Sequence, residues 1–213
     1  MKFENRADAG RQLAARLLAY HDENVVILGL PRGGVPVAAE IARILHARLD
    51  VVPVKKLGVP YQPELAFGAI GEGGVRVVDQ DTVKNMGMLR SEAAEVEECE
   101  ERELRARVHH LRALYPAVSL WGRTAIVVDD GIATGATAKT ACLSVRRRGA
   151  EKVVLAVPVA PFGWRENIGD AADVCVSVSE EPHFFGVGQF YEDFSQVGDD
   201  EVDRCLLGSR SAV

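Results

Sequence analysis

Two adjacent carboxylates follow an apolar run in the segment AIVVDDGIATGAT, residues 125–137. After Asp129 and Asp130, the chain passes through small and hydroxyl-bearing residues before a helical pattern begins near Ala138. Backbone N–H groups at such a helix start bind a phosphate, helped by the helix dipole. Carboxylates accept hydrogen bonds from the vicinal hydroxyls of a ribose. The pattern therefore predicts a site for a sugar phosphate.

Glycines and threonines in this segment suit a phosphate-binding turn. Gly131 and Gly135 allow tight turns and a close approach of the backbone to a ligand. Thr134 and Thr137 add hydroxyl donors. A polar turn that binds no ligand is the alternative, but ordinary turns do not require this combination of residues.

Two common nucleotide motifs are absent. If a Walker A loop is aligned on Lys139, alanines stand at positions 133 and 138, where glycines are required. No GxGxxG follows any predicted strand, which disfavours a dinucleotide site. Phosphate-accepting signalling domains also have an acidic pair after a strand, but not this threonine and glycine turn.

Strands and helices alternate along the chain. The patterns predict helices over 6–20, 35–49, 89–115 and the second half of 123–150, and strands over 25–30, 50–57, the first half of 123–150, 151–161 and 173–180. This alternation is typical of a parallel α/β sheet with helices on both faces. Residues 58–74 are rich in Gly and Pro and predict a mobile loop with one or two short strands, and 76–79 pairs nearby. Pairs spaced i,i+4 in 89–115, such as Glu98–Arg102, Glu101–Arg105 and Glu103–Arg107, predict a solvated helix.

Composition limits the class of protein. The chain has 213 residues, enough for one domain, and 25 basic against 31 acidic residues give a net charge of −6. Such a balance argues against a general nucleic-acid partner, and no apolar run is long enough for a membrane span. Charges near the N-terminus and four scattered cysteines, without metal-site spacing, predict a cytoplasmic protein.

The segment from Ile126 to Thr137 resembles the phosphoribosyl pyrophosphate (PRPP) motif of type I phosphoribosyltransferases. The resemblance implies a Rossmann-like parallel sheet in one domain over 1–213, with its core at about 24–180 and a small hood from about 1–20 and 181–207. It implies that Asp129 and Asp130 bind the ribose hydroxyls, and Mg²⁺ through water or those hydroxyls. It places the 5-phosphate on residues 133–137, Ala133 and Ala136 included, and it counts Gly131 among the residues that bind PRPP.

Other segments resemble further parts of this family. LGLPRGGVPVAAEIA (28–42) is similar to its pyrophosphate loop, where Arg32, Gly33 and Gly34 would contact the pyrophosphate and a non-proline cis peptide is common. Lys55 and Lys56 resemble the start of the flexible loop that closes over PRPP, and a solvated strand end is the alternative. FFGVGQFYEDFSQV (184–197) resembles the hood of 6-oxopurine enzymes, where Phe184 or Phe185 would stack on the base and Asp193 would accept from it. An aromatic core patch is the alternative.

The resemblance implies an enzyme that transfers the 5-phosphoribosyl group from PRPP to a nitrogenous base and releases pyrophosphate, with Arg32, Asp129, Asp130 and Lys56 as catalytic residues and Mg²⁺ as cofactor. A homodimer is expected. One departure concerns the base: the 6-oxo class has an aspartate where this chain has Ala133, which is more like the adenine or orotate branches. Two alternatives remain open, a PRPP-sensing regulator without turnover and transfer to an acceptor other than a base.

Overall fold

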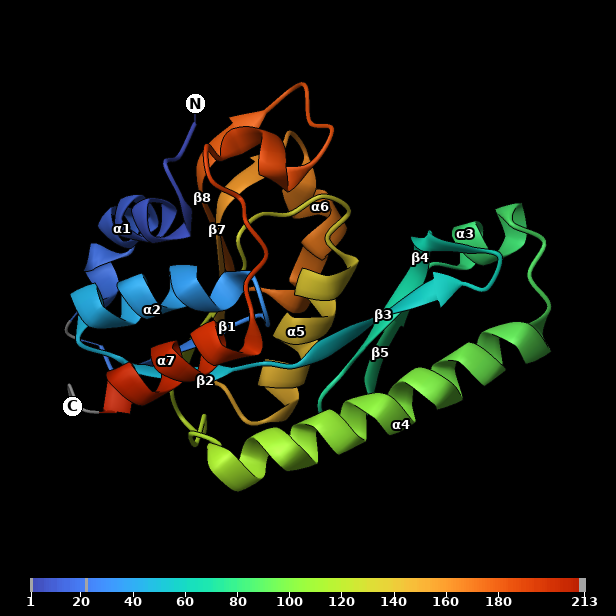
Figure 1. Cartoon of the computed structure of the whole chain (residues 1–213), viewed down its shortest axis with the longest axis horizontal. Helices are drawn as coiled ribbons and strands as arrows, with labels where there is room; N and C mark the ends of the chain where they lie inside the picture. Colours follow the sequence, from blue (N-terminus) through green and yellow to red (C-terminus); the bar gives the residue numbers. More distant parts are fainter. Residues whose placement is uncertain (1, 22, 211–213) are drawn as a thin grey trace.

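A five-stranded parallel sheet forms the centre of the computed structural model, which describes residues 2–21 and 23–210 (Figure 1). The strands lie in the order β2-β1-β6-β7-β8, and every neighbouring pair is parallel. They are β1 (Val25–Gly29), β2 (Arg48–Val51), β6 (Thr124–Val128), β7 (Lys152–Pro161) and β8 (Val174–Glu181). The predicted fold class is confirmed.

Helices cover both faces of this sheet because its strands are apolar on both sides. Successive residues such as Ile27 and Leu28 point into two separate apolar cores. Helices α1 (Arg6–Arg16), α2 (Gly34–Leu45) and α7 (Asp199–Arg210) lie on one face. Helices α5 (Ala136–Arg147) and α6 (Trp164–Ile168) lie on the other. Short 3₁₀ turns are η1 (Leu18–Tyr20), η2 (Gly169–Ala171) and η3 (Val187–Phe190).

The ends of β1 and β6 are neighbours in the sheet. Gly29 pairs with Val128, and the Leu30 N–H donates to the Val128 carbonyl over 2.8 Å. The chain leaves β1 through α2 towards one edge of the sheet and leaves β6 through α5 towards the other. Ligands bind where such connections diverge, so the fold brings both predicted phosphate loops to one place.

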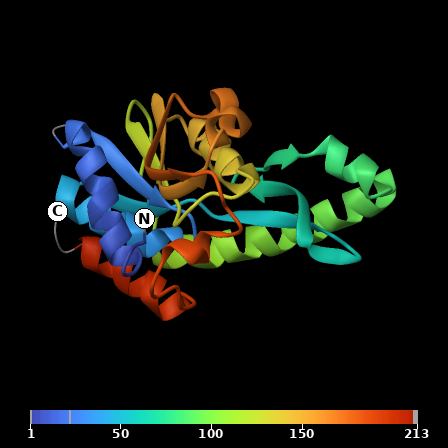
Figure 2. The ribbon, with the colours of Figure 1, turned by 90° about the horizontal axis from the view of Figure 1, so that it is seen from above.

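An arm extends from the main sheet (Figures 1 and 2). It consists of antiparallel strands β3 (Val54–Val59), β4 (Gln62–Gly71) and β5 (Val75–Val78), with helices α3 (Gln80–Asn85) and α4 (Arg90–Leu114). Its own apolar core contains Leu57, Phe67 and Leu104. The loop expected at the start of 58–74 is instead a pair of strands, because apolar side chains between the glycines pack under α4. The expected short strand and the pairing of 76–79 are confirmed, since β4 pairs with β5. The predicted strand 50–57 is likewise two strands, separated at Val52 and Pro53.

The long helix α4 is confirmed, but it is not only a solvated helix. It buries Ala93 and Leu104 against the arm. Of the predicted pairs along it, Arg105 pairs with Glu101, whereas Glu103 pairs with Lys55 on β3. The acidic residues of α4 therefore also hold the arm together.

A group of four charged side chains, one buried and three partly buried, fixes the base of the arm. Asp50 on β2 is 3% exposed and accepts from Arg112 Nη1 over 2.6 Å and from Arg148 Nη2 over 3.0 Å. Glu72, after β4, accepts from Arg112 Nη2 over 2.9 Å. This group links the arm, the main sheet and the end of α5.

The N-terminal segment and the segment after β8 lie side by side and form the hood. The Phe3 N–H donates to the Phe190 carbonyl, and the Glu192 N–H donates to the Phe3 carbonyl, each over 2.8 Å. Helix α7, within the predicted hood range, packs instead against α2 and β2. Residue 1 of that range lies outside the described residues.

Candidate functional site

A cavity of about 360 Å³ opens at the carboxyl ends of β1 and β6. Its walls come from the turn after β1, the arm, the segment after β6 and the hood. It is lined by Leu30, Pro31, Lys56, Asp129, Asp130, Gly131, Ile132, Ala133, Thr134, Gly135, Thr137, Ala138, Val187 and Phe194. The structure thus places the acidic pair and most of the predicted phosphate turn in one cavity; Ala136 is not among its lining residues.

The two carboxylates of the acidic pair are held differently. Asp129 Oδ1 accepts from the Asp130 N–H over 2.9 Å, and Asp130 Oδ2 accepts from Arg6 Nε over 2.9 Å. Burial, and next the charge of Asp130, raise the pKa of Asp129 well above its ordinary value. Burial also raises the pKa of Asp130, although Arg6 opposes this. Two partly buried like charges make this a place where hydroxyl donors or a cation would be favourable.

The phosphate turn ends at the start of α5. Gly135 is the N-cap residue, with φ +88°, a conformation that favours glycine. No side chain caps this helix start, so its first-turn N–H groups have no side-chain acceptor where Gly135, Thr137 and Ala138 line the cavity. This is the geometry of an anion site.

The glycines of the turn after β1 pack against the acidic pair. A Cβ on Gly34 would lie 2.5 Å from the Val128 carbonyl oxygen and 2.8 Å from Asp129 Cα. A Cβ on Gly131 would lie 2.6 Å from Val187 Cγ1 of the hood. Neither Gly33 nor Gly34 lines the cavity. They allow the start of α2 to approach the end of β6, and their predicted contact with pyrophosphate stays a prediction.

The turn between β1 and α2 contains a cis peptide bond between Pro31 and Arg32. The Arg32 side chain is 38% exposed and lies 3.8 Å, Nη1 to Oδ1, from Asp199 at the start of α7. It does not line the cavity, so its role towards pyrophosphate stays a prediction.

The two predicted loop lysines point in different directions. Lys56 lines the cavity. The Lys55 ammonium instead pairs with Glu100 over 2.7 Å and with Glu103, both on α4. Those hydrogen bonds and charges raise the pKa of Lys55, although burial, the largest single effect, opposes them. Successive residues on a strand face opposite sides, so only one of the pair reaches the site.

The predicted base-binding residues do not line the cavity. Phe184 packs on Phe190 with ring centroids 5.2 Å apart, and Phe185 is 93% exposed. Asp193 accepts from the Ser195 N–H over 2.9 Å, which lowers its pKa. The hood aromatic at the cavity is instead Phe194. Phe194 lies within the hood segment 184–197 but was not predicted, because no periodic pattern there indicates which ring faces the cavity.

Arg6 and Tyr191 were missed by the sequence analysis. Arg6 is the first residue of α1 and pairs with Asp130, which is 124 positions away in the sequence. The Tyr191 hydroxyl donates to the Asp130 carbonyl oxygen over 2.6 Å. A single arginine at a helix start has no distinctive spacing, so no sequence signal could have indicated it.

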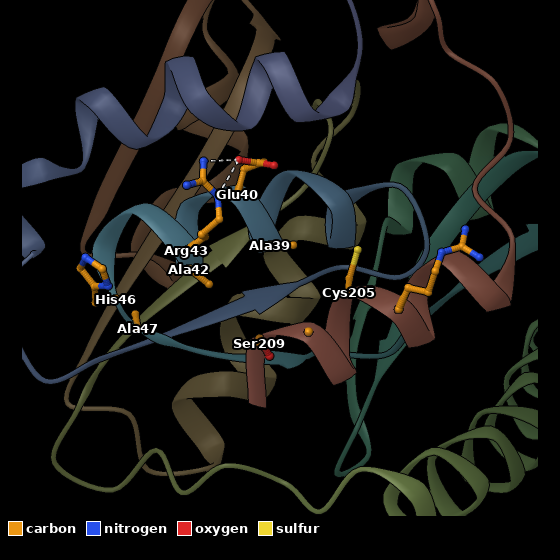
Figure 3. A pocket seen from close by; sticks show the side chains of 10 residues that line it. Ala39, Glu40, Ala42, Arg43, His46, Ala47, Cys205 and Ser209 are labelled. Atoms are coloured by element: carbon orange, nitrogen blue, oxygen red, sulfur yellow. Dashed lines mark hydrogen bonds and ion pairs between the residues drawn. The ribbon is translucent and has the colours of Figure 1, made fainter. Parts of the chain in front are cut away.

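A second cavity, of about 320 Å³, lies between α2 and α7 (Figure 3). It has alanines at Ala39 and Ala42, and Arg43 is paired with Glu40 over 2.8 Å. It shares no lining residue with the acidic-pair cavity.

Across 2–21 and 23–210, no group of three or more His, Cys, Asp or Glu is placed to hold a metal ion. In the same part of the chain, no helix is both long and apolar enough to cross a membrane.

Known proteins resemble this chain over most of its length. The family model for the phosphoribosyl transferase domain matches residues 2–195. Two Mycobacterium tuberculosis proteins with the provisional name phosphoribosyl transferase are 52% identical over 200 residues. The match covers 94% of this chain and 45% of each relative, so the chain spans about half the length of these curated relatives.

The similarity extends to the whole fold of a solved structure. The crystal structure of TT1426 from Thermus thermophilus is 40% identical, with a TM-score of 0.80, and the match covers 98% of this chain and 99% of that one. A shorter match, 47% identical over 51 residues, is to an adenine phosphoribosyltransferase from Kineococcus radiotolerans, and it covers 23% of this chain and 28% of that protein.

Proposed function

Since the chain belongs to the phosphoribosyl transferase domain family, we propose that it transfers the 5-phosphoribosyl group of PRPP to a ring nitrogen of a purine or related base. In this reaction the acceptor nitrogen forms a bond to C1 of the ribose. The bond from C1 to pyrophosphate breaks, pyrophosphate leaves with the electron pair, and the nitrogen loses its proton. One observation carries the proposal: the acidic pair and the uncapped start of α5 line one cavity.

The donor would bind along the wall formed by residues 129–138. First-turn N–H groups of α5, with the Thr134 and Thr137 hydroxyls, would hold the 5-phosphate. Asp129 and Asp130 would accept from the ribose hydroxyls. As positive charge develops on the sugar ring, the same carboxylates would stabilise it, because they are partly buried and already in place.

The pyrophosphate would lie towards the turn after β1 and the arm. Lys56 is the lysine that lines the cavity there, and it would offset charge on the leaving group. Arg32 lies in the same turn and would contribute charge if its side chain leaves Asp199. The arm would shield the donor from water, which otherwise hydrolyses it.

The acceptor would enter between the phosphate turn and the hood. Phe194 and Val187 line that side of the cavity and offer an aromatic and an aliphatic surface to a flat ring. The local similarity to an adenine phosphoribosyltransferase supports a purine. Ala133 supports an acceptor that needs no carboxylate at that position.

The donor set fits Mg²⁺. Asp129 and Asp130 are hard oxygen ligands, and Mg²⁺ is usually held by one or two carboxylates together with waters and substrate phosphates. When bound, the ion would neutralise charge on the pyrophosphate. The metal requirement is part of the proposal.

A PRPP-binding regulator is the alternative, because the residues that bind the donor would be the same. Lys56 at the cavity favours the enzyme, since a cation beside the leaving group assists its departure. Transfer to an acceptor other than a base is a further alternative, and it too predicts PRPP binding without pyrophosphate release when only nucleobases are supplied.

The proposal is tested by pyrophosphate release. Purified protein is incubated with Mg²⁺, PRPP and each common nucleobase, and we expect release with at least one purine and loss of release with EDTA. A double variant, Asp129→Asn with Asp130→Asn, should lose PRPP binding in calorimetry while its circular dichroism is unchanged. Binding of PRPP without release with any base would favour the regulator or an acceptor other than a base, and retained binding by the double variant would show that the site is misassigned.

A further inference from the structure

We propose that Arg6 is a positioning residue that joins the sugar side of the site to the hood. The inference rests on the proposed function, because it takes Asp130 to be a ribose-binding group. Arg6 does not line the cavity. It contacts two residues that do, Asp130 and Phe194, which come from different segments of the chain.

The Arg6 guanidinium makes three different contacts. Its Nε donates to Asp130 Oδ2 over 2.9 Å, and its Nη1 donates to the Ser195 carbonyl oxygen over 2.7 Å. Its Cζ lies 4.0 Å from the centroid of the Phe194 ring. A guanidinium is planar, so it can use its edge for the two oxygens and its face for the aromatic ring.

Burial makes these contacts specific. The Arg6 side chain is 12% exposed and that of Asp130 is 14% exposed. At this exposure the pair is screened less by solvent than a surface pair, and the hydrogen bond fixes which oxygen of Asp130 is used. The Asp130 carboxylate is therefore presented to the cavity in one orientation.

A second connection follows the same path. Tyr191 donates to the Asp130 carbonyl oxygen over 2.6 Å, and its ring lies 5.0 Å, centroid to centroid, from that of Phe194. The backbone and the side chain of Asp130 are thus both tied to the hood. If the hood contact is lost, the carboxylate should lose its orientation, and the sugar should bind less well.

A purely structural role would look different in binding data. If Arg6 only attached α1 to the hood, its loss would lower stability and weaken all ligands alike. If it orients Asp130, its loss should weaken ligands that contain the sugar and leave pyrophosphate, which would bind near Lys56, almost unchanged. The two roles are therefore separable with two small probes.

The experiment measures dissociation constants of ribose 5-phosphate and of inorganic pyrophosphate, each with Mg²⁺, by calorimetry. We expect Arg6→Gln to weaken ribose 5-phosphate about tenfold, the loss of one charged hydrogen bond. The dissociation constant of pyrophosphate should change by less than about twofold in the same variant. The ribose 5-phosphate affinity of Arg6→Lys should lie between those of the wild type and Arg6→Gln, because an ammonium keeps the charge but cannot make all three contacts. Arg11→Gln, also on α1 and 47% exposed, is the matched control and should bind as the wild type does.

Two results would overturn the inference. One is ribose 5-phosphate affinity in Arg6→Gln equal to that of the wild type. The other is an equal loss for both probes together with a lower Tm, which indicates a structural role only. If the wild-type protein binds neither ribose 5-phosphate nor PRPP, the proposed function fails and this inference fails with it.

Discussion

The Cα of Gly33 lies so close to Asp130 that a Cβ built on it would be 2.1 Å from Oδ2 of that carboxylate. The same oxygen accepts the hydrogen bond from Arg6. Gly33 is therefore a packing requirement of the acidic pair, in addition to any contact it makes with a ligand. A side chain here and the present position of Asp130 are mutually exclusive.

Gly33→Ala should therefore displace the Asp130 carboxylate from Arg6. We expect PRPP affinity to fall about tenfold or more, because a charge-assisted contact is worth about 1.5–3 kcal/mol. Calorimetry with PRPP and Mg²⁺ measures this. Gly198→Ala is the matched control, because a Cβ there meets no atom within 4 Å. Equal affinities of the two variants would show that Asp130 has room to move without consequence.

The acidic pair should make the ligand-free protein less stable as pH rises. In the unfolded chain Asp129 has its ordinary pKa of 3.8, whereas in the fold burial and Asp130 raise the pKa of its carboxyl. The folded state thus binds more protons between these two values, so the free energy of unfolding falls as pH rises through that interval. The loss is complete above the raised value.

Asp129→Asn should remove this loss. In EDTA at pH 8, we expect the variant to have a higher Tm than the wild type, on the order of a few degrees, and the difference should shrink on acidification. Asp193→Asn is the control, because the pKa of Asp193 is lowered and its neutralisation gives no such gain. A Tm difference between Asp129→Asn and the wild type that is the same at all pH values would contradict a raised pKa of Asp129.

The main sheet was predictable because each of its elements has a clear local pattern. Strands β1, β6 and β7 are apolar runs, β8 alternates apolar and polar residues, and α2 and α5 follow glycine-rich turns. Those patterns gave the fold class and the position of the acidic pair. The arm was not predictable, because glycine and proline in 58–74 interrupt the apolar pattern that would indicate strands covered by α4.

The donor side of the site was more predictable than the acceptor side. Asp129 to Thr137 is contiguous in sequence, so its chemistry can be read locally. The acceptor side depends on contacts between distant segments: Arg6 meets Asp130 and Phe194 only after the N-terminus pairs with residues 190–193. Phe184 and Phe185 lie in the same aromatic-rich segment as Phe194, but only Phe194 lines the cavity.

The buried charges at the base of the arm should dominate its stability. Arg112→Met leaves Asp50, which is 3% exposed, with one of its two arginine partners, and removes both bonds from Arg112 to Glu72. We expect a loss of about 3–5 kcal/mol in the free energy of unfolding, measured with urea. Arg105→Met, on the same helix but in an exposed pair, should change it by less than about 0.5 kcal/mol. Similar losses for both would show that burial of the group is unimportant.

Lys55 and Lys56 offer the sharpest comparison, because neighbours of identical type face different surroundings. Lys56→Ala removes a cation from the cavity, so PRPP affinity should fall about tenfold, the loss of one charged contact to a phosphate. Lys55→Ala removes only the pairs with α4 and should leave PRPP affinity within about twofold of the wild type. Binding is measured by calorimetry, and PRPP turnover is followed in parallel. If Lys55→Ala were the more damaging of the two, the arm would have to twist on binding so that β3 turns its other face to the donor.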